Sequence, residues 1–206
     1  MIKIGALVSG GGTNLQAILD AIDKGGIDAE VTAVVSSKDG AYALERASAR
    51  GIETAVMRKK DYESPKDYDI ALADFFKKRN VDLIVYAGFM LILGPDFVNQ
   101  FENKMINIHP ALIPSFCGKG YYGLHVHEAV LKAGVKVTGA TVHFVTAECD
   151  AGPIILQKAV EVMDDDTPET LQRRVMEQAE WVIYPEAVKL FAEGRLEIVD
   201  GIVKRR

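Results

Sequence analysis

Residues 2–19 read Ile-Lys-Ile-Gly-Ala-Leu-Val-Ser-Gly-Gly-Gly-Thr-Asn-Leu-Gln-Ala-Ile-Leu, and they predict the start of an α/β sheet. An apolar run of strand length, Ile2–Val8, ends at Ser9-Gly10-Gly11-Gly12. Thr13 can cap the helix that follows, because its hydroxyl would accept from a free backbone N–H of the first turn. Apolar side chains then recur at helical spacing, at Leu15, Ile18, Leu19 and Ile22.

Apolar runs and amphipathic stretches continue to alternate along the chain. Strands are predicted at 30–36, 54–57, 81–87, 105–108, 137–145 and 154–162, and helices at 42–50, 65–79, 95–101 and 128–133. A long helix is predicted after Asp166-Thr167-Pro168-Glu169, and a hairpin at 195–203. Continuously apolar strands that alternate with helices indicate a sheet covered on both faces. The predicted fold class is therefore α/β, with a doubly wound, mostly parallel sheet and helices on both faces.

The length and composition predict one globular domain of 206 residues. The net charge is −5 and no dense basic run precedes the last three residues, which argues against nucleic acid as a partner. No signal peptide or membrane-spanning stretch is recognisable, so no membrane partner is expected. Two cysteines, Cys117 and Cys149, make no disulfide framework, and the expected location is the cytoplasm.

The glycine loop before Thr13 fits neither common nucleotide motif. A dinucleotide fingerprint would need Gly or Ala where Leu15 stands, and a P-loop would need a Gly-Lys-Ser/Thr sequence. The free N–H groups of a helix N-terminus still suit a single phosphate, with Gly12, Thr13 and Asn14 around it. A tight turn that binds no ligand is the alternative.

A second polar motif follows the apolar strand at 105–108. Side chains alternate across a strand, so Asn107 and His109 share a face where the strand ends. His109 can act as a general acid or base, and the amide of Asn107 can stabilise an oxyanion. Asp150, in the polar loop 146–153, could reach the same cleft and raise the pKa of His109. Together they suggest attack on a carbonyl without a protein nucleophile; the alternative is a structural pair satisfied by the backbone.

Other polar residues give weaker signals. His125 and His127 are predicted to be surface residues and not metal ligands. His143 lies on a predicted strand and could line the cleft or sit in the core. Cys149 is interpreted as a small core or loop residue, and Asp164-Asp165-Asp166 as the acidic start of a helix.

Five motifs occur in the order found in the phosphoribosylglycinamide formyltransferases, also called glycinamide ribonucleotide transformylases. They are Ser9-Gly-Gly-Gly-Thr-Asn14, Gly88-Phe-Met90, Asn107-Ile-His109-Pro-Ala-Leu-Ile-Pro114, Val142-His-Phe-Val-Thr146 and Asp150-Ala-Gly-Pro-Ile-Ile155. Over nearly its whole length the chain resembles this family, which belongs to the folate-dependent formyltransferase superfamily with its Rossmann-like fold. Glu180 and Tyr184-Pro185 strengthen the resemblance.

The resemblance implies transfer of a formyl group from 10-formyltetrahydrofolate to the amine of 5′-phosphoribosylglycinamide, in de novo purine biosynthesis. The products are formylglycinamide ribonucleotide and tetrahydrofolate, and no metal is needed. By resemblance, the catalytic residues are His109, Asn107 and Asp150; the phosphate and ribose ligands are Gly12, Thr13, Asn14 and Glu180; and the folate ligands are Met90, Leu91, Ile92, Leu93, Asn107 and Lys66. In this single formyltransferase domain, about residues 1–100 would bind the nucleotide phosphate. About residues 101–206 would bind folate and catalyse the reaction, in a monomer or homodimer.

The chain departs from the family pattern in two places. Leu91 stands where relatives commonly carry Arg, which removes a contact from that side chain to the glutamate tail of folate. The loop 116–123 is longer than in many relatives, and its glycines suggest a mobile lid.

Three other functions share parts of this pattern. Methionyl-tRNA formyltransferase carries an additional RNA-binding domain and a basic surface, and formyltetrahydrofolate deformylase usually carries an N-terminal regulatory domain. Neither feature is expected here. A silent binding module would lack one of His109, Asn107 and Asp150, and all three are present.

Overall fold

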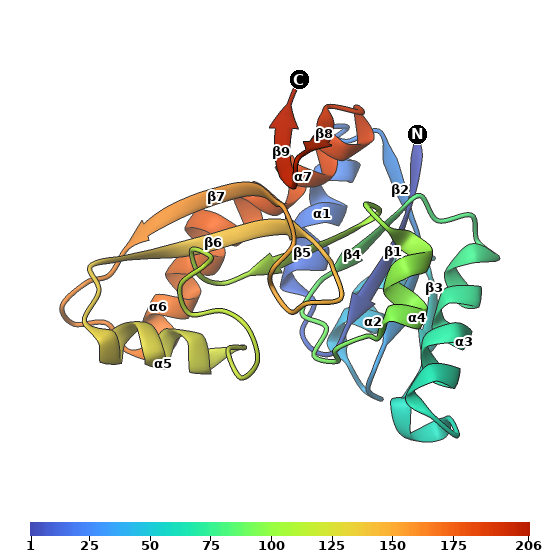
Figure 1. Cartoon of the computed structure of the whole chain (residues 1–206), viewed down its shortest axis with the longest axis horizontal. Coiled ribbons are helices and arrows are strands. Elements are labelled where there is room, and N and C mark those ends of the chain that lie inside the picture. Colours follow the sequence, from blue (N-terminus) through green and yellow to red (C-terminus); the bar gives the residue numbers. More distant parts are fainter.

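A seven-stranded sheet in the order β3-β2-β1-β4-β5-β6-β7 forms the centre of the computed structural model, which describes all 206 residues (Figure 1). The strands are β1 (Ile2–Val8), β2 (Ala29–Ser36), β3 (Glu53–Val56), β4 (Leu83–Tyr86), β5 (Met105–His109), β6 (Val137–Phe144) and β7 (Ile154–Glu161). The strands β1 to β5 pair in parallel, whereas β6 and β7 are antiparallel to their neighbours. The predicted doubly wound, mostly parallel sheet is confirmed.

Helices cover both faces of the sheet (Figure 1). They are α1 (Thr13–Asp23), α2 (Tyr42–Ser48), α3 (Pro65–Lys77), α4 (Pro95–Val98), α5 (Leu124–Ala133), α6 (Pro168–Val175) and α7 (Trp181–Ala192), with short 3₁₀ turns at Lys59–Asp61 and Asn99–Phe101. Alternate residues of β4 belong to different cores: Val85 packs with α1 and α7, whereas Ile84 packs with α3 and α4. None of the helices combines the length and the apolar composition needed to cross a bilayer.

The predicted long helix is present and contains a π-helical segment. A capping box between Thr167 and Thr170 starts it, with Pro168 in its first turn. Its α-helical parts, α6 and α7, are joined by the π-helix Met176–Glu180, whose last residue is a predicted ribose ligand. Such π segments occur frequently at functional sites.

Two local predictions need correction. Thr13 does not cap α1: the N-cap is Gly12, in a left-handed conformation at φ 69°, and no side chain caps the helix. A Cβ at Gly12 would lie 2.5 Å from that of Ala43, so only glycine fits this turn. Helix α5 begins at Leu124, earlier than predicted. The terminal hairpin, β8 (Leu196–Val199) and β9 (Ile202–Arg205), turns at Asp200-Gly201 as predicted.

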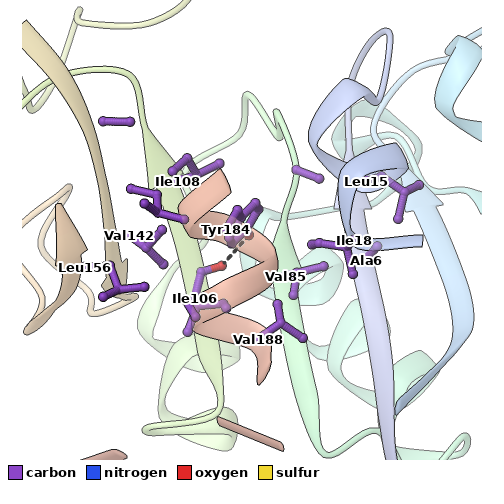
Figure 2. Packing of buried hydrophobic residues seen from close by; sticks show 14 of the residues in the cluster. Ala6, Leu15, Ile18, Val85, Ile106, Ile108, Val142, Leu156, Tyr184 and Val188 are labelled. Carbon is purple, nitrogen blue, oxygen red and sulfur yellow. Dashed lines mark hydrogen bonds between the residues drawn. The ribbon is translucent and has the colours of Figure 1, made fainter. Parts of the chain in front are cut away.

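Tyr184 anchors α7 to the sheet from inside the larger core. Its side chain is fully buried, and Figure 2 shows its hydroxyl directed at Ile106. The hydroxyl donates to the carbonyls of Tyr86 and Ile106, at 2.9 and 3.1 Å. The first carbonyl belongs to the last residue of β4 and the second to the second residue of β5, so a single side chain ties the helix to both strands.

Replacing Tyr184 with Phe is expected to destabilise the fold by about 1–2 kcal/mol, because two buried carbonyls lose a donor while the ring still packs. Chemical denaturation of both proteins measures the difference. The control is Tyr42→Phe, at a side chain that is exposed to solvent. Equal free energies of unfolding for the two variants would contradict the anchoring role of the Tyr184 hydroxyl.

Candidate active site

The carboxyl ends of β1, β4 and β5 open onto a cleft of about 690 Å³. This edge of a parallel sheet is where α/β folds bind ligands. The predicted site residues that line the cleft are Thr13, Asn14, Met90, Leu91, Ile92, Leu93, Asn107, His109, Asp150 and Glu180. Gly12 immediately precedes Thr13, whereas Lys66, on the first turn of α3, is not among the residues that line the cleft.

His109 lies between a carboxylate and a backbone carbonyl at the end of β5. The residue is 4% exposed, its Nε2 donates to the carbonyl of Phe116 at 2.8 Å, and its Nδ1 is 3.5 Å from Asp150 Oδ2. The same carboxylate oxygen accepts from the N–H of Gly118 at 2.9 Å. Asp150 itself has φ 53°, a left-handed conformation that Asp tolerates better than most residues. The predicted His109–Asp150 pair is therefore in place.

His143 completes this polar cluster from the neighbouring strand β6. It lies directly opposite Asn107 in the antiparallel pairing, with its Nε2 3.3 Å from Asn107 Nδ2 and 3.6 Å from Asp150 Oδ1. Its Nδ1 donates to the carbonyl of Phe144 at 2.8 Å. From the sequence alone, His143 could either line the cleft or sit in the core, because only the strand register places it beside Asn107.

The pKa values of both Asp150 and His109 are lowered in this cluster. Burial raises the pKa of Asp150, but the neighbouring imidazoles of His143 and His109 and the N–H of Gly118 outweigh it and hold that pKa at about 2. Burial lowers the pKa of His109, and the opposing effects of Asp150 and the Phe116 carbonyl are smaller. The expectation that Asp150 raises the pKa of His109 is correct for that contact but wrong for the net shift, because desolvation dominates.

His127 was predicted to be a surface residue and is instead fully buried. It lines the cleft from α5, neither ring nitrogen has a hydrogen-bond partner, and burial lowers its pKa to about 4. His125, in contrast, is exposed and pairs with Glu128, as expected of a surface residue. The helical spacing of Val126, His127 and Val130 on the buried face of α5 is the signal that could have revealed this. No group of three or more His, Cys, Asp or Glu side chains could hold a metal ion.

The glycine loop and the π-helix meet on one wall of the cleft. Asn14 Nδ2 donates to Glu180 Oε2 at 2.6 Å, whereas Asn14 Oδ1 is buried without a partner. The first amides of α1 have no intrahelical acceptor, so they can bind an anion. Lys38, two residues beyond the end of β2, also lines this cleft and forms no ion pair. Lys38 was not among the residues predicted from the sequence, although its place after a strand end could have indicated it.

The opposite wall is the segment 88–94, which has neither helix nor strand before α4. Its side chains Met90 and Ile92 are exposed, and the backbone of 91–93 forms no hydrogen bond within the protein. Free amides and carbonyls beside apolar side chains suit a flat heterocycle with polar edges.

Comparisons with known proteins agree on one family. Residues 2–188 match the sequence profile described as formyl transferase. The chain is 43% identical over 202 residues to a phosphoribosylglycinamide formyltransferase of Haemophilus influenzae. The aligned region covers 98% of this chain and 92% of that protein. It is 45% identical over 197 residues, 96% of its length, to a trifunctional purine biosynthetic protein of Gallus gallus, of which it spans 19%. A crystal structure of glycinamide ribonucleotide transformylase 1 from Symbiobacterium toebii superposes with a TM-score of 0.94 at 47% identity, covering 100% of this chain and 94% of that one.

The buried Glu180 predicts a pH-dependent stability. Burial raises its pKa from 4.5 to about 7, although the hydrogen bond from Asn14 opposes the shift. Between these pH values the unfolded chain releases the proton and the folded chain keeps it, so folding becomes less favourable as the pH rises. The wild type is therefore expected to lose up to about 1.4 kcal/mol per pH unit relative to Glu180→Gln across this window.

Denaturation of both proteins at pH 5 and pH 8 measures this effect. The control is Glu177→Gln, which removes an exposed carboxylate from the same π-helix and should show no such trend. A stability difference between wild type and Glu180→Gln that is the same at both pH values would contradict the burial of a neutral Glu180.

Proposed function

The chain belongs to the formyl transferase family, and we propose that its cleft holds 10-formyltetrahydrofolate against 5′-phosphoribosylglycinamide. Its reaction is formyl transfer to the glycinamide ribonucleotide, a step of purine biosynthesis. The observation that carries the proposed site is the His109–Asp150 pair, which lies between a wall suited to a phosphate and a wall suited to a folate.

In the proposed complex the ribonucleotide lies against the glycine loop. The free amides at the start of α1 and the side chains of Thr13 and Asn14 hold the phosphate. Glu180, already bonded to Asn14, accepts from the ribose hydroxyls. Lys38 adds a positive charge on the same wall, without a competing ion pair. This arrangement points the glycinamide amine toward β5.

The folate lies against the segment 88–94. Its pterin binds the free backbone groups of 91–93, with Met90 and Ile92 as apolar neighbours. Leu91 supplies no charge to the glutamate tail, and Lys119 is the lysine of the facing loop that lines the cleft. The formyl group then lies beside Asn107 and His109. The carboxylates of the tail extend toward solvent, where polar contacts are easily exchanged.

The reaction needs no protein nucleophile. The neutral amine attacks the formyl carbon, a C–N bond forms, and the carbonyl oxygen becomes an oxyanion. Nε2–H of His109 and one N–H of Asn107 donate to it. The attacking amine releases a proton, the bond from carbon to N10 of the folate breaks, and N10 receives a proton. Asp150, ionised and beside His109, supports this transfer through water.

Phe116 stands where the substrate oxygen is needed. Its carbonyl accepts from His109 Nε2 at 2.8 Å, so the formyl oxygen can use this donor only after the loop 116–123 moves. Phe116 has φ 50°, an uncommon conformation for a bulky residue. We propose that this loop is a lid that rearranges when folate binds.

The proposed partners are small molecules, and no metal takes part. The thiols of Cys117 and Cys149 are unpaired, which suits a reducing cytoplasm. Whether the working form is a monomer or a homodimer does not affect the chemistry, because every proposed ligand belongs to one chain.

A competition assay tests the function. Purified protein with 10-formyltetrahydrofolate is offered glycinamide ribonucleotide, water and charged tRNA, and each product is measured. Formylation of the ribonucleotide alone is expected. Formate as the main product would identify water as the acceptor, and formylated tRNA would identify the tRNA. Either result would contradict the proposed acceptor. Binding of both ligands without any product would indicate a silent binding module.

His109→Ala and Asp150→Asn are each expected to lower turnover by about 10²- to 10⁴-fold, because each removes part of the acid–base apparatus. Steady-state kinetics and circular dichroism are measured together. His125→Ala, at an exposed histidine on α5, serves as the control and should leave turnover unchanged. If either site variant retained near-normal turnover in a folded protein, the proposed mechanism would be wrong.

Ligand binding is expected to change the rate of tryptic cleavage after Lys119, an exposed residue of the lid. The rate is followed by mass spectrometry with and without a folate analogue. Cleavage near the chain end at Lys204 provides an internal control, because that site is remote in sequence and exposed. Identical rates at Lys119 in the two samples would argue against a mobile lid.

A further inference from the structure

Ser9 occupies a junction between the ends of three neighbouring strands. It follows β1, is 7% exposed, and does not line the cleft. Its hydroxyl accepts from the N–H of Met90 at 2.9 Å, just beyond β4. It also shares a 2.7 Å hydrogen bond with the hydroxyl of Ser37, just beyond β2.

The segment 88–94 has few other internal constraints. The backbone N–H groups with a protein partner are those of Met90, bonded to Ser9, and Gly94, bonded to Asp69 Oδ2 at 2.8 Å. Gly88 begins the segment at φ 78°, where the chain turns away from β4. Two side-chain acceptors thus hold the segment at Met90 and Gly94, and the backbone of 91–93 between them forms no hydrogen bond within the protein.

We propose that Ser9 is a positioning residue for the folate, acting through the backbone of Met90. This inference rests on the proposed function, since it assigns the segment 88–94 to the folate. Ser9 itself belongs to the glycine loop, on the ribonucleotide side of the cleft. A side chain of the loop that binds the ribonucleotide therefore fixes the shape of the wall that binds the folate.

The physical reason is preorganisation. Met90 is exposed, and the buried Ser9 hydroxyl is the acceptor that holds its N–H in place. Loss of that hydroxyl would let Met90 move to find another partner, such as water. The free amides of 91–93 would then no longer hold one geometry, and folate would have to order them on binding.

The ribonucleotide wall has independent supports. Gly10 accepts from the N–H of Ala43 at 3.1 Å, and Gly11 accepts from Arg46 Nε at 2.8 Å. These bonds remain when the Ser9 hydroxyl is removed. The expected defect is therefore confined to folate, although the substituted residue lies in the phosphate loop.

Steady-state kinetics of Ser9→Ala and Ser37→Ala test the proposal. Ser9→Ala is expected to raise the KM for the folate by about fivefold or more, the effect of losing one hydrogen bond, with a nearly unchanged KM for the ribonucleotide. Ser37→Ala is the matched control, since it deletes an equally buried hydroxyl but leaves Ser9 free to accept from Met90. Equal folate KM values for the two variants, or a defect confined to the ribonucleotide, would overturn the proposal.

Hydrogen exchange of the Met90 amide, measured without substrates, gives a readout that is independent of activity. Exchange is expected to be faster in Ser9→Ala than in wild type and Ser37→Ala, with the amides in β1 unchanged. Faster exchange combined with an inactive wild type would overturn the proposed function but would support the tether, the hydrogen bond from the Met90 N–H to the Ser9 hydroxyl. Unchanged exchange in Ser9→Ala would reject the tether even in an active enzyme. If Ser9→Ala is less stable, thermal unfolding of both variants separates a general loss from the local one.

Discussion

The hydrogen bonds of the Tyr184 hydroxyl to the carbonyls of Tyr86 and Ile106 are the contact on which the site's geometry depends. They bind α7 to the two strands whose ends carry the folate segment and the catalytic pair. Glu180 lies one turn earlier on the same continuous helix, so the anchor that holds α7 against the sheet also holds Glu180 opposite Asn14. A polar group in the centre of an apolar core is costly without partners, and here it has two.

Two buried carboxylates on this frame have opposite protonation behaviour. Asp150 has the polar neighbours His143 and His109 and the N–H of Gly118, and its pKa stays at about 2. Glu180 has only the amide of Asn14 to offset its burial, and its pKa rises to about 7. Active sites typically place similar ionisable groups in environments that shift their pKa values in opposite directions. The ionised carboxylate beside His109 suits proton transfer, whereas a carboxyl group beside the glycine loop can hold a sugar without adding full charge near a phosphate.

The sequence predicted the parts of this structure that depend on local pattern. Apolar runs located the strands, and alternation placed Asn107 and His109 on one face of β5. What it could not provide depends on neighbours distant in the chain. His143 joins the cluster only through the register of β6 on β5, and the need for glycine at position 12 follows from the close approach of Ala43. The net pKa shift of His109 depends on how much protein surrounds it, which no local pattern reports.

The position of the cleft follows from the direction of chain winding. From β1 the sheet grows one way through β2 and β3 and the other way through β4 and β5, so the loops after β1 and β4 diverge and leave a space between them. Each wall of that space then draws on both halves of the chain: Glu180 joins Asn14, and the segment 88–94 lines the same cleft as Asn107. A division at about residue 100 into a phosphate half and a folate half describes the order of the motifs, but the proposed subsites each cross it. Ser9 is the residue at which the two walls are in direct contact, and this is why a single hydroxyl there can influence a substrate it does not touch.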